Sequence, residues 1–245
     1  MADFNNYQNR MAQSRAQSGE MIDEGLRAYM LRVYNLMALG LAITGVAAYG
    51  TYAFAASNPA FQALLYTSPL RWVIMLAPIG LVFFLSFRIQ SMSVSAAQMT
   101  FWVYAALMGL SLSAIFFVFT NESIVQTFFV TAASFGALSL YGYTTKKDLS
   151  GLGSFLIMGL FGLIIASIVN IFLQSSAMGF AISAIGVLIF AGLTAYDTQK
   201  IKEMYWDGHD SVTTGRMAIM GALTLYLDFI NLFTFLLQFM GNRDE

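Results

Sequence analysis

The fold is decided by residues 149–197, which read LSGLGSFLIMGLFGLIIASIVNIFLQSSAMGFAISAIGVLIFAGLTAYD. No Asp, Glu, Lys, Arg or His occurs in this stretch before its last residue, Asp197. A helix that crosses about 30 Å of hydrocarbon needs about 20 mostly apolar residues, so there is room for two such helices around the polar turn at 174–176. Strands of a membrane barrel would alternate apolar and polar residues in units of about ten, and these residues do not alternate.

The composition of the whole chain also indicates a membrane protein. Of its 245 residues, 58 % are hydrophobic and 10 % are charged, whereas about 25 % are charged in a typical soluble domain. The net charge of −1 provides no basic surface, so we expect no nucleic-acid partner. The lack of cysteine excludes disulfides and thiolate metal sites, and the single histidine, His209, leaves little for a zinc site or a Ser-His-Asp triad.

Seven apolar stretches are long enough to cross a bilayer, which predicts an all-α integral membrane protein. The predicted helices cover residues 33–56, 70–88, 97–119, 123–141, 154–173, 179–197 and 217–240. They form one domain over residues 27–245, and we expect the polar residues 1–26 before it to be a disordered tail without a signal-peptide core. The connection at 198–216 fits either a helix lying on the membrane surface or a solvated loop.

The basic residues predict the orientation in the membrane. Of the 12 Lys and Arg residues, ten flank the predicted helix ends on the side of the N-terminus, and only Arg71 and Arg243 lie on the other side. Loops that stay in the cytoplasm carry the excess of Lys and Arg. We therefore expect a cytoplasmic N-terminus and a C-terminus on the opposite side.

Asp228 is the only Asp, Glu, Lys, Arg or His between Met217 and Asn242. It follows Met217 by 11 residues, or about 16 Å of helix, which places it near the bilayer midplane. A carboxylate there costs about 2.5–3.5 kcal/mol on insertion scales, so it must face the protein interior or a water-filled cavity. Thr224 and Asn231 share its helix face and predict a lined path for ions or protons. The alternative is a structural carboxylate with satisfied hydrogen bonds.

Two further charges lie where predicted helices end on the cytoplasmic side. These are Arg88, at the end of the second helix, and Asp197, at the end of the sixth. By the predicted boundaries Asp228 lies about 10 Å deeper than both, so sequence spacing alone does not establish contact. Asp197 could equally be a solvated helix terminus, and Arg88 a positive-inside anchor.

Four segments carry a resemblance to a known family. They are 104–111 (YAALMGLS), 141–149 (YGYTTKKDL), 195–201 (AYDTQKI) and 225–233 (LYLDFINLF). They resemble the signature segments of the Bax inhibitor family, the transmembrane BAX-inhibitor-motif proteins, and the resemblance extends from Arg32 to Met240. It implies a seven-helix bundle with the seventh helix, 217–240, at its centre, and the composition suggests a bacterial inner-membrane member.

The same resemblance implies a pH-sensitive calcium leak. The two aspartates of the family's sensor pair match Asp197 and Asp228, and the arginine that latches the helix 6 aspartate matches Arg88 by its place in the helix order. Some bacterial members regulate a membrane-bound ATP-dependent protease, which implies an alternative function without transport. In that alternative, residues 1–26 would be the working part.

The residues themselves are compatible with calcium as the transported ion. Ca²⁺ takes oxygen ligands, and Asp197, Asp228, Thr224 and Asn231 offer them, while two carboxylates alone suit transit better than storage. We expect no resident cofactor. A retinal pigment is disfavoured because residues 217–240 contain no lysine, and an intramembrane protease because the spans lack histidine and a Gly-Asp motif. We therefore expect no catalytic residues and no enzyme activity.

The carboxylate pair also predicts a pH response. Two carboxylates within reach of each other in low dielectric cannot both ionise cheaply, so the pair takes up protons in two steps. Acid should release Arg88 from Asp197 and open the cytoplasmic end. If Asp197 is not the sensor, His209 is the next candidate because its ordinary pKa is about 6.5.

Overall fold

The computed structural model describes the backbone of residues 2–243 and the side chains of residues 24–243. Its elements are helices α1 (Ala2–Ser57), α2 (Pro59–Tyr66), α3 (Leu70–Arg88), α4 (Val94–Leu112), α5 (Asn121–Thr144), α6 (Ser150–Leu173), α7 (Ser176–Glu203) and α8 (Ser211–Met240), with short 3-10 turns η1 (Ile89–Ser91) and η2 (Ser113–Phe117). All of these helices except the short α2 are long and apolar enough to cross a membrane, which makes seven spans. The prediction of an all-α membrane protein is confirmed.

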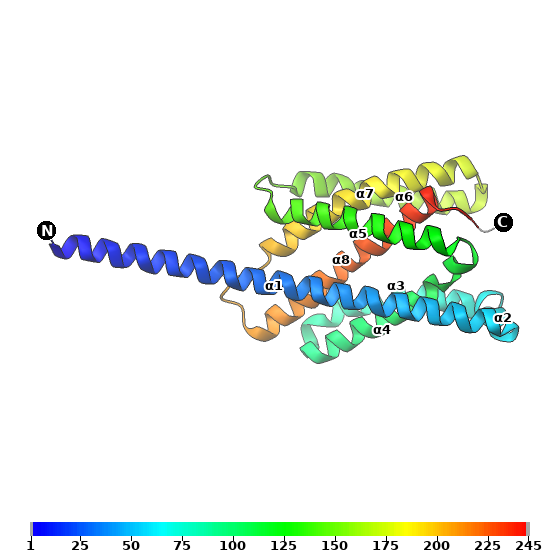
Figure 1. Cartoon of the computed structure of the whole chain (residues 1–245), viewed down its shortest axis with the longest axis horizontal. Helices are drawn as coiled ribbons and strands as arrows, with labels where there is room; N and C mark the ends of the chain where they lie inside the picture. The colour runs from blue at the N-terminus through cyan, green and yellow to red at the C-terminus, as the bar shows by residue number, and fades with distance from the viewer. Residues whose placement is uncertain (1, 244–245) are drawn as a thin grey trace.

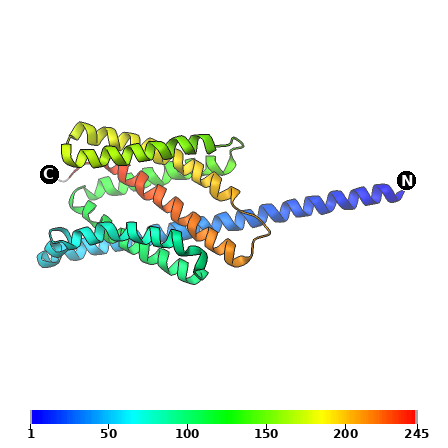
Figure 2. The ribbon, with the colours of Figure 1, turned by 180° about the vertical axis from the view of Figure 1, so that it is seen from behind.

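Helix α8 is the centre of the bundle. In its most apolar stretch 67 % of the residues are buried, against 39 % in α7, the next most buried span. It crosses between α1, α3 and α4 on one side and α5, α6 and α7 on the other (Figures 1 and 2). Its main contacts are with α1, α4, α5 and α7, while α3 packs on α4 and α6 packs on α7. The seventh span is therefore central, with four helices directly around it and two outside them.

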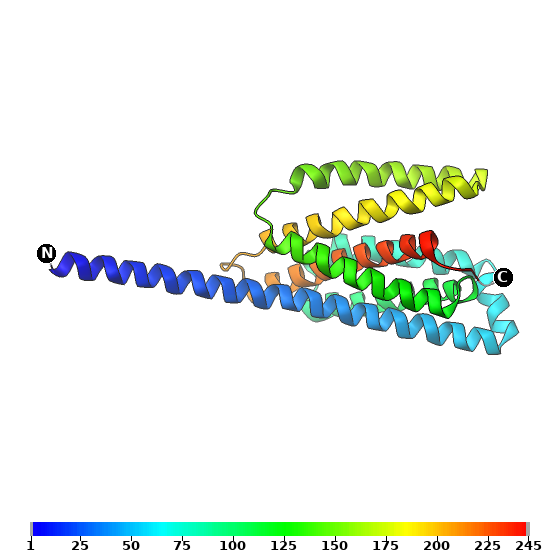
Figure 3. The same cartoon turned by 45° about the horizontal axis from the view of Figure 1, so that its top comes forward.

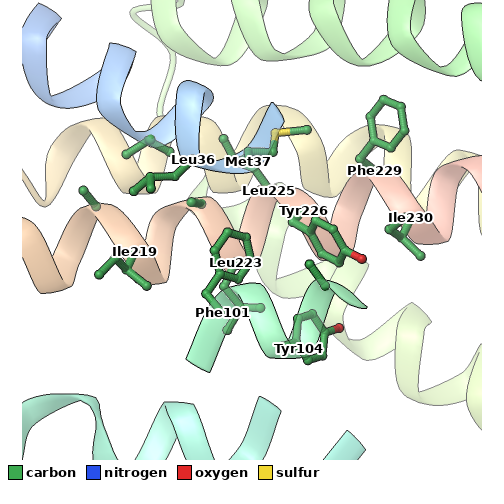
Figure 4. Close-up of a cluster of buried hydrophobic side chains, with 14 of the residues drawn as sticks. Leu36, Met37, Phe101, Tyr104, Ile219, Leu223, Leu225, Tyr226, Phe229 and Ile230 are labelled. Carbon is green, nitrogen blue, oxygen red and sulfur yellow. The ribbon is translucent and has the colours of Figure 1, made fainter. Parts of the chain in front are cut away.

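Buried aromatic rings attach α8 to α1 and α4. Tyr226 lies edge-on to Phe101 and Tyr104 of α4, with ring centroids 5.8 Å and 5.6 Å away, and the three side chains are almost completely buried (Figure 4). The Tyr226 hydroxyl is hydrogen-bonded to Thr44 Oγ1 of α1 at 2.6 Å, and Thr44 Oγ1 also lies 2.9 Å from the Ala105 carbonyl oxygen. Because lipid is as apolar as these side chains, close packing and hydrogen bonds hold such helices together.

The first helix begins earlier than predicted. α1 is continuous from Ala2, where a disordered tail was expected for residues 1–26, and no proline interrupts the chain before Pro59. Figure 3 shows its N-terminal part extending beyond the bundle. Pro59 itself starts α2, with Asn58 as the N-cap, because proline fits the first helical position.

The predicted connection at 198–216 is wrong. α7 continues to Glu203 and α8 begins at Ser211, so only residues 204–210 join them. Lys and Glu are good helix formers and extend α7, whose Ile201 is buried. Asp210 caps α8, and hydrogen bonding from Thr213 holds the pKa of Asp210 below its usual range.

We use "inner end" for the end of the bundle where α3, α5 and α7 finish, and "outer end" for the opposite one. Both ends of the α5–α6 connection are held by α7 at the inner end. Gln199 accepts a hydrogen bond from the Leu149 amide and donates one to the Lys147 carbonyl, both at 2.8 Å. Lys202 Nζ donates to the Tyr143 carbonyl at 2.8 Å. These bonds fix the position of α7 relative to α5.

Candidate functional site

The two predicted aspartates meet between α7 and α8. The carboxyl groups of Asp197 and Asp228 lie next to each other and line the same cavity. Two carboxyl groups can share a hydrogen bond only when one proton lies between them. At this separation the charge of one carboxyl group affects the other, so the two residues are treated together as a pair.

The structure corrects the predicted depth of Asp197. The sequence analysis placed it at the end of its helix, about 10 Å from the level of Asp228. Six further residues extend α7 to Glu203, so Asp197 lies about 9 Å inside the helix end. The inner part of α8 is also six residues longer than predicted. Because both helices gain the same length at the inner end, the new boundaries alone do not bring the two carboxyl groups to one level, and it is the packing of α7 on α8 that does so.

A cavity of about 540 Å³ opens beside the pair, between α6, α7 and α8. Asp197, Thr224, Asp228 and Asn231 all line it, together with Ser167 of α6. The remaining lining residues are apolar and come from the same three helices. The polar face that the sequence predicts on 217–240 therefore faces this cavity between α6, α7 and α8.

The polar groups around this cavity are oriented as acceptors. Asn231 Nδ2 donates to the Leu227 carbonyl at 2.8 Å, which leaves its Oδ1 available. The hydroxyls of Thr224 and Ser167 donate to the carbonyls of Met220 and Leu163, which leaves their oxygen lone pairs free. A wall of oxygen acceptors suits a cation or a proton and does not suit an anion.

Asp228 is the most buried charged group of the site. Only 4 % of its surface is exposed, and its Oδ2 accepts no hydrogen bond from a donor within the described part of the chain. A buried oxygen without a partner is destabilising by about 1–3 kcal/mol, and more for a charged group. A bound proton or cation would remove this cost.

Arg88 is not brought to the pair. It lies exposed at the inner end of α3, and the side chains that act on Asp197 are Lys200 and Asp228. α3 packs on α4, on the opposite side of α8 from the cavity. The predicted ion pair between Arg88 and Asp197 is therefore not formed in this structure.

The signature-like segments contact one another around the site. Gly142 of 141–149 lies so close to the Ala195 carbonyl of α7 that a side chain would collide with it. Ala195 is two residues from Asp197, so this approach of α5 sets the position of the pair. The family model described as "Inhibitor of apoptosis-promoting Bax1" matches residues 26–245.

The chain belongs to the Bax inhibitor family. Inner membrane protein YbhL of Escherichia coli K12 is 49 % identical over 89 % of this chain and 93 % of its own. A protein of Rickettsia prowazekii is 50 % identical over 91 % of this chain and 93 % of its own length. A Caulobacter vibrioides protein is 46 % identical over the full length of both. The predicted family is thus confirmed.

Sequence reasoning missed a second cavity in this Bax inhibitor family member. It measures about 540 Å³ and lies at the outer end of the same three helices. Asn170 of α6, Ser183 of α7 and Gln238 of α8 line it, and the Ser183 hydroxyl donates to Gln238 Oε1 at 3.3 Å. Gln238 shares the polar face of Asp228, but nothing in the sequence shows that α6 and α7 supply matching groups.

An aromatic residue lies between the two cavities. Phe235 of α8 lines the inner cavity and stacks on Phe190 of α7, with ring centroids 5.8 Å apart. It packs against Gly186, where an added Cβ would lie 2.6 Å from the ring. On both α7 and α8 these residues come between the linings of the inner and outer cavities. Phe235 thus fills the space that Gly186 leaves between α7 and α8.

Proposed function

We propose that this protein is a pH-sensitive leak channel for Ca²⁺. The observation that carries the proposal is the Asp197–Asp228 pair beside a cavity whose polar lining consists of oxygen acceptors. Ca²⁺ prefers six to eight oxygen ligands. Two carboxylates, Thr224 and Asn231 supply fewer, so the ion would keep part of its water shell and leave again easily.

The path would follow the seam between α6, α7 and α8. Its inner part is the cavity of the carboxyl pair, and its outer part is the cavity lined by Asn170, Ser183 and Gln238. Phe235, packed on Gly186, is the constriction between them. Apolar constrictions close channels by excluding water. The structure then corresponds to a closed state.

Protons would act on the pair in two opposing ways. They compete with Ca²⁺ for the carboxylate oxygens, which weakens binding of the ion. They also remove negative charge at the inner end of the seam and so loosen the attraction between Asp197 and nearby cations such as Lys200. We expect opening to dominate at mildly acidic pH, so flux should rise on acidification.

The location follows from the relatives and the basic residues. YbhL is named an inner membrane protein, and we place this chain in the bacterial inner membrane as a multi-pass protein. Ten of its 12 Lys and Arg residues lie at the inner end or on α1 before it, so the inner end and the N-terminus would be cytoplasmic.

The test is Ca²⁺ uptake into liposomes that contain a calcium dye, measured at several pH values. Asp228→Asn should abolish the pH dependence of uptake because the amide cannot share a proton with Asp197. Glu122→Gln is the matched control, since Glu122 is exposed at the start of α5 and lines no cavity of the seam. Uptake by Asp228→Asn that follows the wild-type pH profile would refute the proposal.

A second candidate is regulation of a membrane-bound ATP-dependent protease without transport. One observation favours it: α1 continues as a helix from Ala2, beyond the bundle (Figure 1). Such an extension could bind a partner outside the membrane. Deletion of residues 2–23 separates the two functions, because a leak would survive the deletion and a tethered regulator would lose its effect.

A further inference from the structure

A groove of about 500 Å³ runs between α1 and α5, away from the carboxyl pair. Tyr34 and Ser139 line it from the two helices, and their hydroxyls are hydrogen-bonded to each other at 2.7 Å. Its lining residues are Arg27, Met30, Leu31, Tyr34, Phe135, Gly136, Ser139, Leu140 and Tyr143. Leu31 and Leu140 are exposed, so the groove opens toward the lipid.

The groove has a polar end and an apolar end. α1 runs outward and α5 runs inward, so Arg27 and Tyr143 meet at the inner end. Phe135 and Gly136 lie at the other end with Tyr34. Seven residues separate the two ends on α1 (27 to 34) and on α5 (136 to 143), which gives about 10 Å of groove on each helix. This polarity matches a molecule with a head at the membrane surface and an apolar tail.

Arg27 lines the polar end, and a second cation, Lys202, contacts the lining residue Tyr143. Arg27 is exposed there. Lys202 Nζ lies 2.8 Å from the Tyr143 carbonyl oxygen and 5.5 Å from the Tyr143 ring centre. Guanidinium and ammonium groups are donors that bind a phosphate. A zwitterionic head would bring its own positive charge into this cluster, so an anionic head is favoured.

The apolar end is open because of Gly136. An added Cβ at Gly136 would meet no atom within 4 Å, so no side chain of the described part of the protein fills this end. We infer that the groove is a binding site for an anionic phospholipid. Its phosphate lies against Arg27, Tyr143 and Lys202, and one acyl chain passes over Gly136 toward Phe135. This site is separate from the proposed ion path and does not depend on it.

Photolabelling of the full chain in detergent tests the site. The probes are phosphatidylglycerol and phosphatidylcholine, each with a diazirine in one acyl chain, and labelled peptides are identified by mass spectrometry. Peptides containing residues 27–34 and 135–143 should be labelled by phosphatidylglycerol above the level of the lipid-facing helix α6. A basic residue near a membrane surface contributes about a fivefold preference for anionic lipid. Arg27→Gln should therefore reduce the preference over phosphatidylcholine about fivefold.

Two glycine variants provide the matched pair. Gly136→Leu should reduce labelling of the groove to the level of α6. Gly162→Leu should leave it unchanged, because Gly162 also has open space but lies on α6 outside the groove. An added Cβ at either position meets no atom within 4 Å, so we expect both proteins to fold. Equal groove labelling in Gly136→Leu and wild type, or by both lipids in wild type, would overturn the inference.

Discussion

Replacing Phe235 by alanine should turn the closed seam into a leak. The ring is half-buried and packs on Gly186 and Phe190. Full burial of a phenylalanine makes its replacement by alanine cost about 3–5 kcal/mol, so the loss for this half-buried ring is about 2 kcal/mol. If that loss falls on the closed state alone, the open fraction rises about 30-fold. Removal of the ring would also join the inner and outer cavities.

The assay is resting Ca²⁺ uptake into liposomes at about pH 8, where the acid response of the carboxyl pair is smallest. Phe235→Ala should take up Ca²⁺ up to about 30-fold faster than wild type. Phe235→Leu should stay nearly closed because it keeps an apolar plug. Phe161→Ala is the control, since Phe161 is 64 % exposed on α6. If Phe235→Ala takes up Ca²⁺ at the wild-type rate while Asp228→Asn loses its pH dependence, Phe235 is not the constriction. The proposed channel function would still stand.

Three further variants test the rest of the site. Asp197→Asn should be leaky and nearly flat between about pH 8 and pH 5, because a neutral amide imitates the protonated acid, and liposome uptake that tracks wild type would point to His209 instead. Arg88→Ala should raise the resting leak only if α3 approaches α7 in another state, so unchanged uptake with a folded protein would remove the latch. Gly142→Val should lower thermal stability by an amount typical of overpacking, about 1–3 kcal/mol, because its side chain collides with Ala195; an unchanged melting temperature would contradict the close approach of α5 and α7.

The sequence predicts the spans well because membrane helices carry their own signal. Arg88 ends α3 as predicted, since a charged residue closes an apolar run. The prediction fails where helices leave the hydrocarbon. The apolar composition that marks a span ends at the membrane surface, but the helix itself can continue beyond it. Residues 198–203 are polar apart from Ile201 and are still helical. That extension places Asp197 two turns inside α7, and the packing of α7 on α8 brings it to Asp228.

The residues of the site divide in the same way. Asp228, Thr224 and Asn231 lie on one helix, so helical spacing alone predicts that they share a face. Ser167, Phe190 and Gly186 come from other helices. Their distance from α8 depends on how the helices pack, which cannot be derived from residue spacing along the chain. For Arg88 the position in the helix order was predicted correctly, but this position did not predict which side chains lie next to it.

The hydrogen bonds of Thr44 have a mechanical consequence. They join α8 to α1 and α4 through Tyr226 and the Ala105 carbonyl, so these three helices form one rigid unit. The other wall of the seam is the hairpin of α6 and α7, which turns at Gln174 in a left-handed conformation, with φ of 50°. Because this turn is tight, a widening of the gap between α8 and α7 would displace α6 together with α7. Because the chain contains no cysteine, single cysteines introduced on α6 and α8 could carry spin labels, and the distance between the labels would report any movement of α6 relative to α8.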